Sequence, residues 1–359
     1  MPRLIDVARA AGVSPSTASR ALTRPELVRR TVVARVRQAA EQLGYVPNHV
    51  ARSLRRQESK ILGLVVPDNT NPFFAEVARG IEAACFRAGY TLILGNSDRS
   101  LEKEAAQARV LVEKRVDGVL LFNTSDHSAP TIAWLLARGM PVVLLERRSP
   151  GPAVDCVLSD NVGGVRAALE HLAAQGHRRI ACLVGDVQAA HYAERLAAYL
   201  ATVRELGLAA APELVRTGLV TYADGRQAAL ELLHSPVPPT ALFCTTDTLA
   251  IGALRGAALA GARVPDDLAV VGYGDIELAA YTQPPLTSVA QDKQRVGELA
   301  VQVLLRRLAQ RAQGEAWQPE VIVVPTRLVV RESSGAAPPG RTHEGSGRVG
   351  PGGEGRASG

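Results

Sequence analysis

Short hydroxyl side chains and an arginine are concentrated in residues 14–20, SPSTASR. Ser14 can cap a helix that has Pro15 at its first position, where the missing N–H costs nothing. Such a helix buries Val13 and Ala18, so its other face is polar. Short side chains let a helix approach DNA closely, and an arginine can reach a guanine edge or a phosphate. The candidate DNA contacts on this face are Ser14, Pro15, Ser16, Thr17, Ser19 and Arg20.

Two further helices are expected around this segment. Residues 4–11 have helical apolar spacing, and Gly12 is a candidate left-handed stop before the second helix. Two helices joined by a tight glycine-containing turn form a helix-turn-helix, whose second helix enters the major groove. A third helix is expected over about 31–44, ending at Gly44, and its inward residues are Val32, Val36, Ala39, Ala40 and Leu43.

Basic charge is confined to the N-terminal part of the chain. The 359 residues carry a formal net charge of +6, and residues 1–60 hold 12 Lys and Arg against 4 Asp and Glu. The remaining 299 residues hold 29 against 31. This distribution indicates a polyanion partner for the N-terminal part, although charge alone also fits a solvated basic surface without a partner.

Residues 47–60 form a basic connector with one isolated large apolar residue, Leu54. Pro47 and Asn48 can start a short helix here. In a plain linker an exposed leucine is unremarkable, whereas in a minor-groove element it can enter a base step and kink the duplex. The candidate DNA contacts of this segment are Asn48, Ala51, Arg52, Leu54 and Arg55.

The bulk of the chain, from residue 61 to about 332, alternates β-branched apolar runs with longer amphipathic stretches. This alternation predicts an α/β fold with doubly wound parallel sheets. The pattern restarts near residue 179, which predicts two lobes with a ligand cleft beyond the carboxyl ends of the strands. The expected strands are 61–66, 91–95, 118–122, 141–146, 179–185, 241–247 and 268–275; the expected helices are 74–88, 101–114, 192–206, 223–234 and 248–260.

The sequence lacks the common catalytic motifs, so we expect a protein that is not an enzyme and needs no cofactor or metal. A P-loop lysine motif, a GxSxG elbow and an HExxH helix are missing. The GSGRVG of residues 345–350 matches a dinucleotide fingerprint, but no strand precedes it. The four cysteines, whose spacing fits neither a metal site nor a disulfide framework, are Cys85, Cys156, Cys182 and Cys244. Without a signal core or an apolar run of membrane-spanning length, a cytoplasmic protein is expected.

A series of motifs extends from residue 3 to about 332: IDVARAAGVSPSTASRAL, AAEQLGYVPNHVARSLR, GLVVPDNTNPFFAEVARGIE, GYTLILGNS, KRVDGVLLF, DNVGG, EHLAAQGHRRIACLVG, ERLAAY and VVGYGDIELAAYTQPPLTSV. In sequence and order they closely resemble the LacI/GalR family of bacterial transcription regulators. The resemblance implies a DNA-binding headpiece, a hinge helix with Leu54 as the wedge, and a core like that of periplasmic sugar-binding proteins.

The expected division of the chain follows these segments. Residues 1–46 form the helix-turn-helix headpiece, and 47–60 form the hinge helix and linker. Residues 61–332 form a core that binds an effector and dimerises, with an N-lobe of about 61–159 plus 290–320 and a C-lobe of about 160–289 plus 321–332. Residues 333–359, rich in Gly, Ser, Pro and Arg, are expected to be a disordered tail.

Two departures from the family pattern affect the headpiece. Arg3 stands where Thr is common, so the first helix is expected to be less well capped. Residues 29–31, Arg-Arg-Thr, replace a start that resembles Ser-Pro-Glu. We expect Thr31 to cap the third helix, while Arg29 and Arg30 face phosphate.

The resemblance also implies which residues line the effector cleft. Phe73 and Phe74 match aromatic positions that pack on the effector, although each could also be a core residue. Arg195 matches an arginine that grips hydroxyls or carboxylates, and its alternative role is a salt bridge across the lobes. Asp275 could instead be a turn or capping residue. The candidate effector contacts are Phe73, Phe74, Asn123, Asp160, Arg195, Val220, Thr246, Asp247 and Asp275.

Several positions depart from the known ligand patterns. Thr246 replaces a usual Asn and Gly274 a usual Asp, while Val220 replaces an aromatic residue of some members. A sugar that loses the missing carboxylate loses a charge-assisted hydrogen bond of about 1.5–3 kcal/mol, so a typical hexose is not indicated. Ala189 stands where a purine-contacting arginine would be, so a purine is not indicated either. Sugars, polyols, nucleosides and related metabolites remain candidates.

Regulation of transcription, most commonly repression, is the function that the resemblance implies. A homodimer would read a palindromic operator, because each helix-turn-helix reads one half-site. The alternatives are a transport protein that binds sugar and an α/β enzyme that acts on a nucleotide or sugar. Binding to duplex DNA that weakens steeply with salt distinguishes the regulator from both.

Overall fold

The computed structural model describes residues 2–45, 58–148 and 150–335, which divide into two compact units. The first unit holds the N-terminal helices up to residue 61 together with residues 115–117, and the second holds the rest. The expected DNA contacts of the connector lie outside the described residues: Asn48, Ala51, Arg52, Leu54 and Arg55.

Three short helices, packed through alanine and valine, make up most of the first unit. They are α1 (Leu4–Ala10), α2 (Pro15–Thr23) and α3 (Arg30–Gln42), and the 3-10 turn η1 (Pro25–Leu27) precedes α3. Small side chains let the helices approach closely around Val7, Ala18 and Val36, which are fully buried. Gly12 has a φ of +60°, a conformation that glycine adopts without strain and that permits the tight turn after α1. This arrangement confirms the predicted helix-turn-helix.

Two expectations about α3 are wrong. The helix begins at Arg30 with Arg29 as its N-cap, so Thr31 lies inside the first turn and does not cap it. Because α3 ends at Gln42, Leu43 lies beyond it and is 40% exposed. At the start of α1, the Asp6 carboxylate accepts a hydrogen bond of 2.8 Å from the backbone N–H of Arg3.

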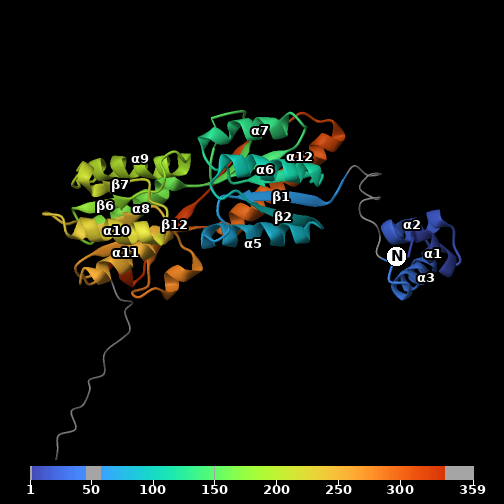
Figure 1. Cartoon of the computed structure of the whole chain (residues 1–359), viewed down its shortest axis with the longest axis horizontal. Helices are drawn as coiled ribbons and strands as arrows, with labels where there is room; N and C mark the ends of the chain where they lie inside the picture. The colour runs from blue at the N-terminus through green and yellow to red at the C-terminus, as the bar shows by residue number, and fades with distance from the viewer. Residues whose placement is uncertain (1, 46–57, 149, 336–359) are drawn as a thin grey trace, which may run out of the picture. The chain divides into compact units, whose positions relative to one another are not determined.

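The second unit contains two six-stranded sheets, as predicted for a two-lobed α/β fold (Figure 1). The first sheet has the strand order β11-β5-β4-β3-β1-β2, and the second has the order β12-β10-β9-β8-β6-β7. The central pairs of both sheets are parallel, and β12 joins β10 in the antiparallel direction. The strands of the first sheet are β1 (Ile61–Val66), β2 (Thr91–Asn96), β3 (Gly118–Leu121), β4 (Val142–Leu145), β5 (Asp155–Ser159) and β11 (Val321–Val324). Those of the second are β6 (Ile180–Leu183), β7 (Val215–Arg216), β8 (Ala241–Cys244), β9 (Ala269–Gly274), β10 (Thr287–Gln291) and β12 (Thr326–Val329).

Helices cover both faces of each sheet, as the crossover connections of parallel strands require (Figure 1). Every strand and helix expected from the sequence of this region is present within a few residues of its expected bounds. The helices are α5 (Pro72–Arg87), α6 (Leu101–Glu113), α7 (Ala129–Leu136), α8 (Asn161–Ala174), α9 (Ala190–Glu205), α10 (Tyr222–Leu233), α11 (Asp247–Leu259) and α12 (Lys293–Gln313). Short 3-10 turns are η2 (Asp126–Ser128), η3 (Pro212–Leu214), η4 (Glu277–Tyr281) and η5 (Glu332–Ser334).

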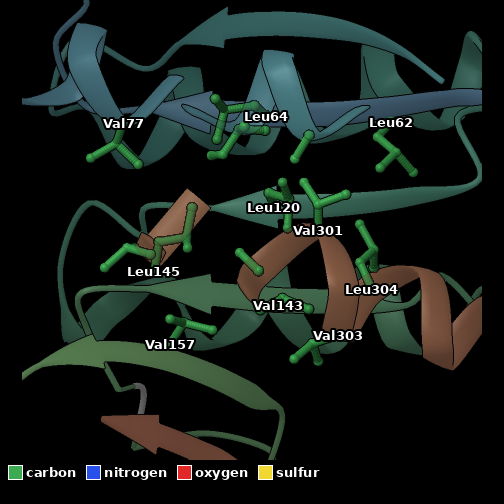
Figure 2. Close-up of a cluster of buried hydrophobic side chains, with 14 of the residues drawn as sticks. Leu62, Leu64, Val77, Leu120, Val143, Leu145, Val157, Val301, Val303 and Leu304 are labelled. Carbon is green, nitrogen blue, oxygen red and sulfur yellow. The ribbon is translucent and has the colours of Figure 1, made fainter. Parts of the chain in front are cut away.

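In the core of the first lobe, strands from the N-terminal part of the chain pack against α12, which lies near its C-terminal end (Figure 2). Leu64 and Leu120 of the sheet pack in one buried cluster with Val301 and Leu304 of α12. Helix α12 also lies against α5, where a Cβ at Gly297 would be 2.8 Å from the backbone nitrogen of Ile81. Only glycine permits this approach, so α12 is an integral layer of the first lobe.

The chain passes between the lobes at Asp160, Asp292 and Pro325. The expected assignment of residues 321–332 to the C-lobe is therefore wrong for its first part. Residues 321–324 form β11, which pairs in parallel with β5 of the first sheet. The expectation of a tail from residue 333 is also wrong at its start, because Ser333 and Ser334 are buried; residues 336–359 lie outside the part that the structure describes.

Within the described ranges, no helix is both long enough and apolar enough to cross a membrane.

A buried ion pair fixes α12 and the entry of β11 to β5. Arg307 donates from Nε and Nη2 to the two oxygens of Asp155, at 2.9 and 2.6 Å, and both side chains are nearly inaccessible to solvent. The same Asp155 carboxylate accepts the backbone N–H of Glu320 at 3.0 Å. Removing one partner of such a pair leaves an uncompensated buried charge.

We therefore expect Asp155→Ala to lower the free energy of unfolding by about 3–5 kcal/mol, measured by urea denaturation of the purified protein. The matched control is Glu205→Ala, which removes an exposed partner of Arg166 and should cost less than about 1 kcal/mol. Equal effects of the two substitutions would contradict a structural role for the Arg307–Asp155 pair.

Candidate functional site

The N-terminus of α2 presents a cluster of linked hydroxyl groups. Ser14 caps the helix by accepting the backbone N–H of Thr17 at 3.1 Å. The Ser14 hydroxyl also lies 2.9 Å from that of Ser16 and 2.8 Å from that of Thr17. The first turn of α2 holds no acidic residue, so its N–H groups and positive dipole end are available to a phosphate.

The polar face of α2 is the one predicted from the sequence. Ser14, Pro15, Ser16 and Arg20 are exposed, whereas Thr17 and Ser19 are half-buried. Arg29 and Arg30 are exposed at the start of α3. In the described part of the chain no carboxylate lies within ion-pair distance of any of these three arginines, so their guanidinium groups can bind an external anion.

A small cavity of about 40 Å³ lies between the lobes of the second unit. Its walls come from the carboxyl ends of strands in both sheets, where ligands of such folds bind. The first lobe contributes Asn71, Phe73, Phe74, Phe122, Glu146 and Arg147. The second lobe contributes His191, Tyr192, Arg195, Thr246, Asp247, Thr248, Tyr273, Ile276 and Gln291.

The aromatic wall is positioned by the cap of α5. Asn71 accepts the backbone N–H of Phe73 at 3.0 Å, which starts the helix so that both phenylalanines follow at once. Phe73 and Phe74 meet edge to face with ring centroids 5.4 Å apart, and Phe74 and Phe122 do so at 5.1 Å. The two expected phenylalanines thus line the cavity and also pack on the core of the first lobe.

Arg195 is held in the cavity wall by groups of its own lobe. It donates to Asn161 Oδ1 at 2.8 Å and to the carbonyl of Thr245 at 2.7 Å. Its guanidinium lies 3.7 Å from the centre of the Tyr273 ring, a stacked arrangement that is favourable for a cation. No carboxylate of the described chain lies within ion-pair distance, so the alternative of a salt bridge across the lobes is wrong.

Gln291 connects the two lobes through Glu146. Its side-chain oxygen accepts from Arg195 at 3.4 Å, and its nitrogen donates to Glu146 Oε2 at 2.9 Å. The other oxygen of Glu146 accepts the hydroxyl of Ser159 at 2.7 Å. Burial raises the pKa of the Glu146 carboxyl, while the hydrogen bonds from Ser159 oppose that shift. Both oxygens of Glu146 therefore have protein donors.

Asp247 and Thr246 line the cavity, but their side-chain oxygens accept hydrogen bonds from neighbouring groups of the second lobe. Asp247 accepts the Ser288 hydroxyl at 2.6 Å and the backbone N–H of Ile276 at 2.8 Å. Burial raises the pKa of Asp247 to about 6. The Thr246 hydroxyl caps α11 by accepting from Leu249 at 3.2 Å.

Four expected effector contacts do not line this cavity. Asp160 caps α8 by accepting the backbone N–H of Gly163 at 2.9 Å. Val220 lies in a separate surface groove. Asp275 forms an ion pair of 2.6 Å with Arg331. Asn123 is fully buried, and its backbone carbonyl accepts from Arg147 at 2.5 Å.

Sequence reasoning missed nine polar or aromatic residues of the cavity. Glu146 and Arg147 directly follow the run PVVLL, so their place after a strand was the available signal. His191 and Tyr192 lie one turn before Arg195 on α9 and carry no signal of their own. The full set is Asn71, Phe122, Glu146, Arg147, His191, Tyr192, Thr248, Tyr273 and Gln291. No group of three or more His, Cys, Asp or Glu in the described ranges could hold a metal ion.

Two family models match the chain. Residues 3–48 match the model of bacterial regulatory proteins, lacI family, and residues 169–334 match that of a periplasmic binding protein-like domain. The HTH-type transcriptional repressor PurR of Aliivibrio fischeri (strain MJ11) is 36% identical over 328 residues, which cover 90% of this chain and 97% of that protein. The ribose operon repressor of Escherichia coli (strain K12) is 35% identical over 310 residues, covering 86% and 94%.

Solved structures agree with these matches. The lac repressor dimer bound to operator and the anti-inducer ONPF has a TM-score of 0.83 at 29% identity, covering 93% of this chain and 99% of that one. The complex of the transcriptional regulator CelR with cellobiose has a TM-score of 0.70 at 34% identity, covering 93% and 100%. The resemblance inferred from the motifs is confirmed: the chain belongs to the lacI family of bacterial regulatory proteins, which regulate transcription by binding DNA.

Proposed function

We propose that this protein represses transcription from a palindromic operator and that a small molecule in the cavity between its lobes sets its operator affinity. The observation that carries the proposal is the composition of the cavity wall, which includes residues of both lobes. A ligand that contacts both walls has different affinities for the open and closed arrangements, and only such a difference can shift a conformational equilibrium.

The reading surface of this proposal is the exposed face of α2. Ser14, Ser16 and Thr17 would contact base edges or phosphate closely, and Arg20 would reach a guanine or a phosphate. Arg29 and Arg30 would bind phosphate, with Pro15 and Ser19 beside them on the face. The contacts assigned to Asn48, Ala51, Arg52, Leu54 and Arg55 remain predictions about the connector.

The proposed effector site comprises the five expected residues that line the cavity, Phe73, Phe74, Arg195, Thr246 and Asp247, together with the nine that sequence reasoning missed. This site binds and does not react, because the Glu146 and Asp247 carboxylates are both occupied by protein donors. Because its partner is chromosomal DNA, we expect the protein in the cytoplasm.

A homodimer is the proposed assembly, and exposed apolar side chains support it. Phe86 of α5 is 78% exposed and Tyr281 of η4 is 76% exposed. The turn η4 lies beside α5, because the backbone N–H of Glu277 donates to Glu76 at 3.0 Å. Large apolar side chains exposed on adjacent elements are typical of a surface that another copy covers.

The DNA-binding surface is tested by selecting duplexes from a randomised pool and measuring affinity as salt is varied. Arg20→Ala should weaken binding by about 1–3 kcal/mol at one base position. Arg30→Ala should weaken binding to all duplexes alike and reduce the slope of log affinity against log salt by about 1. A uniform loss for Arg20→Ala would show that Arg20 contacts phosphate, and a failure to select any sequence would contradict the proposed function.

The effector site is tested by measuring operator affinity with pooled sugars, polyols, nucleosides and small acids. Arg195→Met should abolish the change in affinity that the active pool causes, because the cavity loses its stacked cation. Arg204→Met, on an exposed position of the same helix, should respond as the unaltered protein does. Circular dichroism checks that both variants are folded, and a normal response of folded Arg195→Met would remove Arg195 from the site.

The dimer is tested by sedimentation equilibrium. Phe86→Glu should raise the dissociation constant of the dimer at least roughly tenfold, because it places a charge in an apolar contact. Val237→Glu changes a 59% exposed apolar residue elsewhere and should leave the dimer intact. An unchanged dimer in Phe86→Glu would exclude Phe86 from the interface.

A further inference from the structure

Arg147 is a buried cation in the cavity wall without an acidic partner. Its exposed fraction is 7%, and burial lowers its pKa only to about 10, so it remains charged at neutral pH. No carboxylate among residues 58–148 and 150–335 lies within ion-pair distance of it. Buried charges are costly unless they are paired, so Arg147 needs an explanation.

Among the guanidinium nitrogens of Arg147, Nη1 forms hydrogen bonds with the protein. It donates to the backbone carbonyls of Asn123, at 2.5 Å, and of Thr124. These two bonds fix the plane of the guanidinium. Neither Nε nor Nη2 has a hydrogen-bond partner in the described part of the chain, so this edge of Arg147 is free within the cavity.

The free edge is the one with which an arginine grips a carboxylate in this same protein. Arg307 uses Nε and Nη2 to bind both oxygens of Asp155, at 2.9 and 2.6 Å. Paired N–H groups of a guanidinium match the two oxygens of a planar carboxylate.

His191 is a second unpartnered group of the same cavity. Its Nδ1 atom is buried and has no hydrogen-bond partner in the structure. Burial, with Arg147 and Arg195 nearby, holds the pKa of His191 well below its usual range, so the ring is neutral. A neutral imidazole can accept from a ligand hydroxyl or donate to a ligand oxygen, depending on its tautomer.

No acidic residue forms an ion pair with Arg147 in the described part of the chain, although Glu104 and Asp126 favour its charged form from a greater distance. Glu146 is engaged by Ser159 and Gln291, and Asp247 by Ser288 and Ile276. Arg195 adds a second guanidinium to the wall and has no acidic partner either. The cavity therefore offers two cations to a ligand and no available carboxylate.

We propose that the effector is a small carboxylate, held through its two oxygens by Nε and Nη2 of Arg147, with a hydroxyl or second oxygen near His191. This inference rests on the proposed function, because it specifies the chemical class of ligand for the same cavity. A hydroxy acid of four to six carbons has this combination of groups.

The chemical class of the effector is tested by calorimetry on the full-length protein with a matched panel of ligands. Each hydroxy acid of four to six carbons is paired with the alditol and the phosphate ester of the same skeleton. At least one acid should bind about tenfold or more tightly than both of its counterparts. Tighter binding by the alditols, or by the phosphate esters, would overturn the carboxylate and leave the proposed function standing. If no member of the panel binds and no pooled metabolite changes operator affinity, both the carboxylate effector and the proposed function are contradicted.

The residue is tested with Arg147→Met and its neighbour Arg148→Met, whose side chain is exposed. The first should weaken binding of the selected acid about tenfold to a hundredfold, and the second should not change it. Because Arg147→Met also loses the hydrogen bonds to the carbonyls of Asn123 and Thr124, its melting temperature is measured without ligand to show that it is folded at the temperature of the titration. Arg147→Lys, which keeps the charge but loses the paired N–H edge, should bind with intermediate affinity. Unchanged binding by Arg147→Met would overturn the proposal.

Discussion

The hydrogen bond from Gln291 to Glu146 is the contact on which the geometry of the cavity depends. It joins the end of β10 in the second lobe to the end of β4 in the first. Glu146 has a φ of +58°, which residues other than glycine rarely adopt, and Ser159 holds it there through two hydrogen bonds. Because Gln291 also contacts Arg195, a ligand that displaces Arg195 acts on the first lobe through only two side chains.

Guanidinium groups without an acidic partner occur both on the proposed DNA-binding face and in the cavity, but their surroundings make them act differently. Those of Arg20, Arg29 and Arg30 are exposed, so their attraction to phosphate is long-range and is screened by salt. That of Arg147 is enclosed, so its attraction is short-range and is little affected by salt. The protein can thus find DNA by charge and still recognise a small anion by shape.

Most of the fold could be predicted because its signals are local. The runs ILGLVV and RIACLVG are buried on both faces and form strands, and Ser14-Pro15 starts α2 where the cap chemistry indicates. Residues 321–332 were assigned to the C-lobe as one segment, and only the pairing of β11 with distant β5 and of β12 with β10 divides that segment at Pro325. The same limit applies to the cavity. Asp275 was misplaced because Arg331 binds it from 56 residues away, and the proximity of Arg147 to His191 exists only in the folded chain.

The position of α12 has a consequence for biosynthesis. The sheet of the first lobe begins with residues that leave the ribosome early, yet its buried face is covered by Val301 and Leu304 of α12, and its edge strand is β11. During translation the earliest strands of the core must therefore wait for about 240 further residues before their hydrophobic face is enclosed. The first lobe is the first part of the core to be synthesised and among the last to be completed, and this interval is when a nascent chain most needs a chaperone.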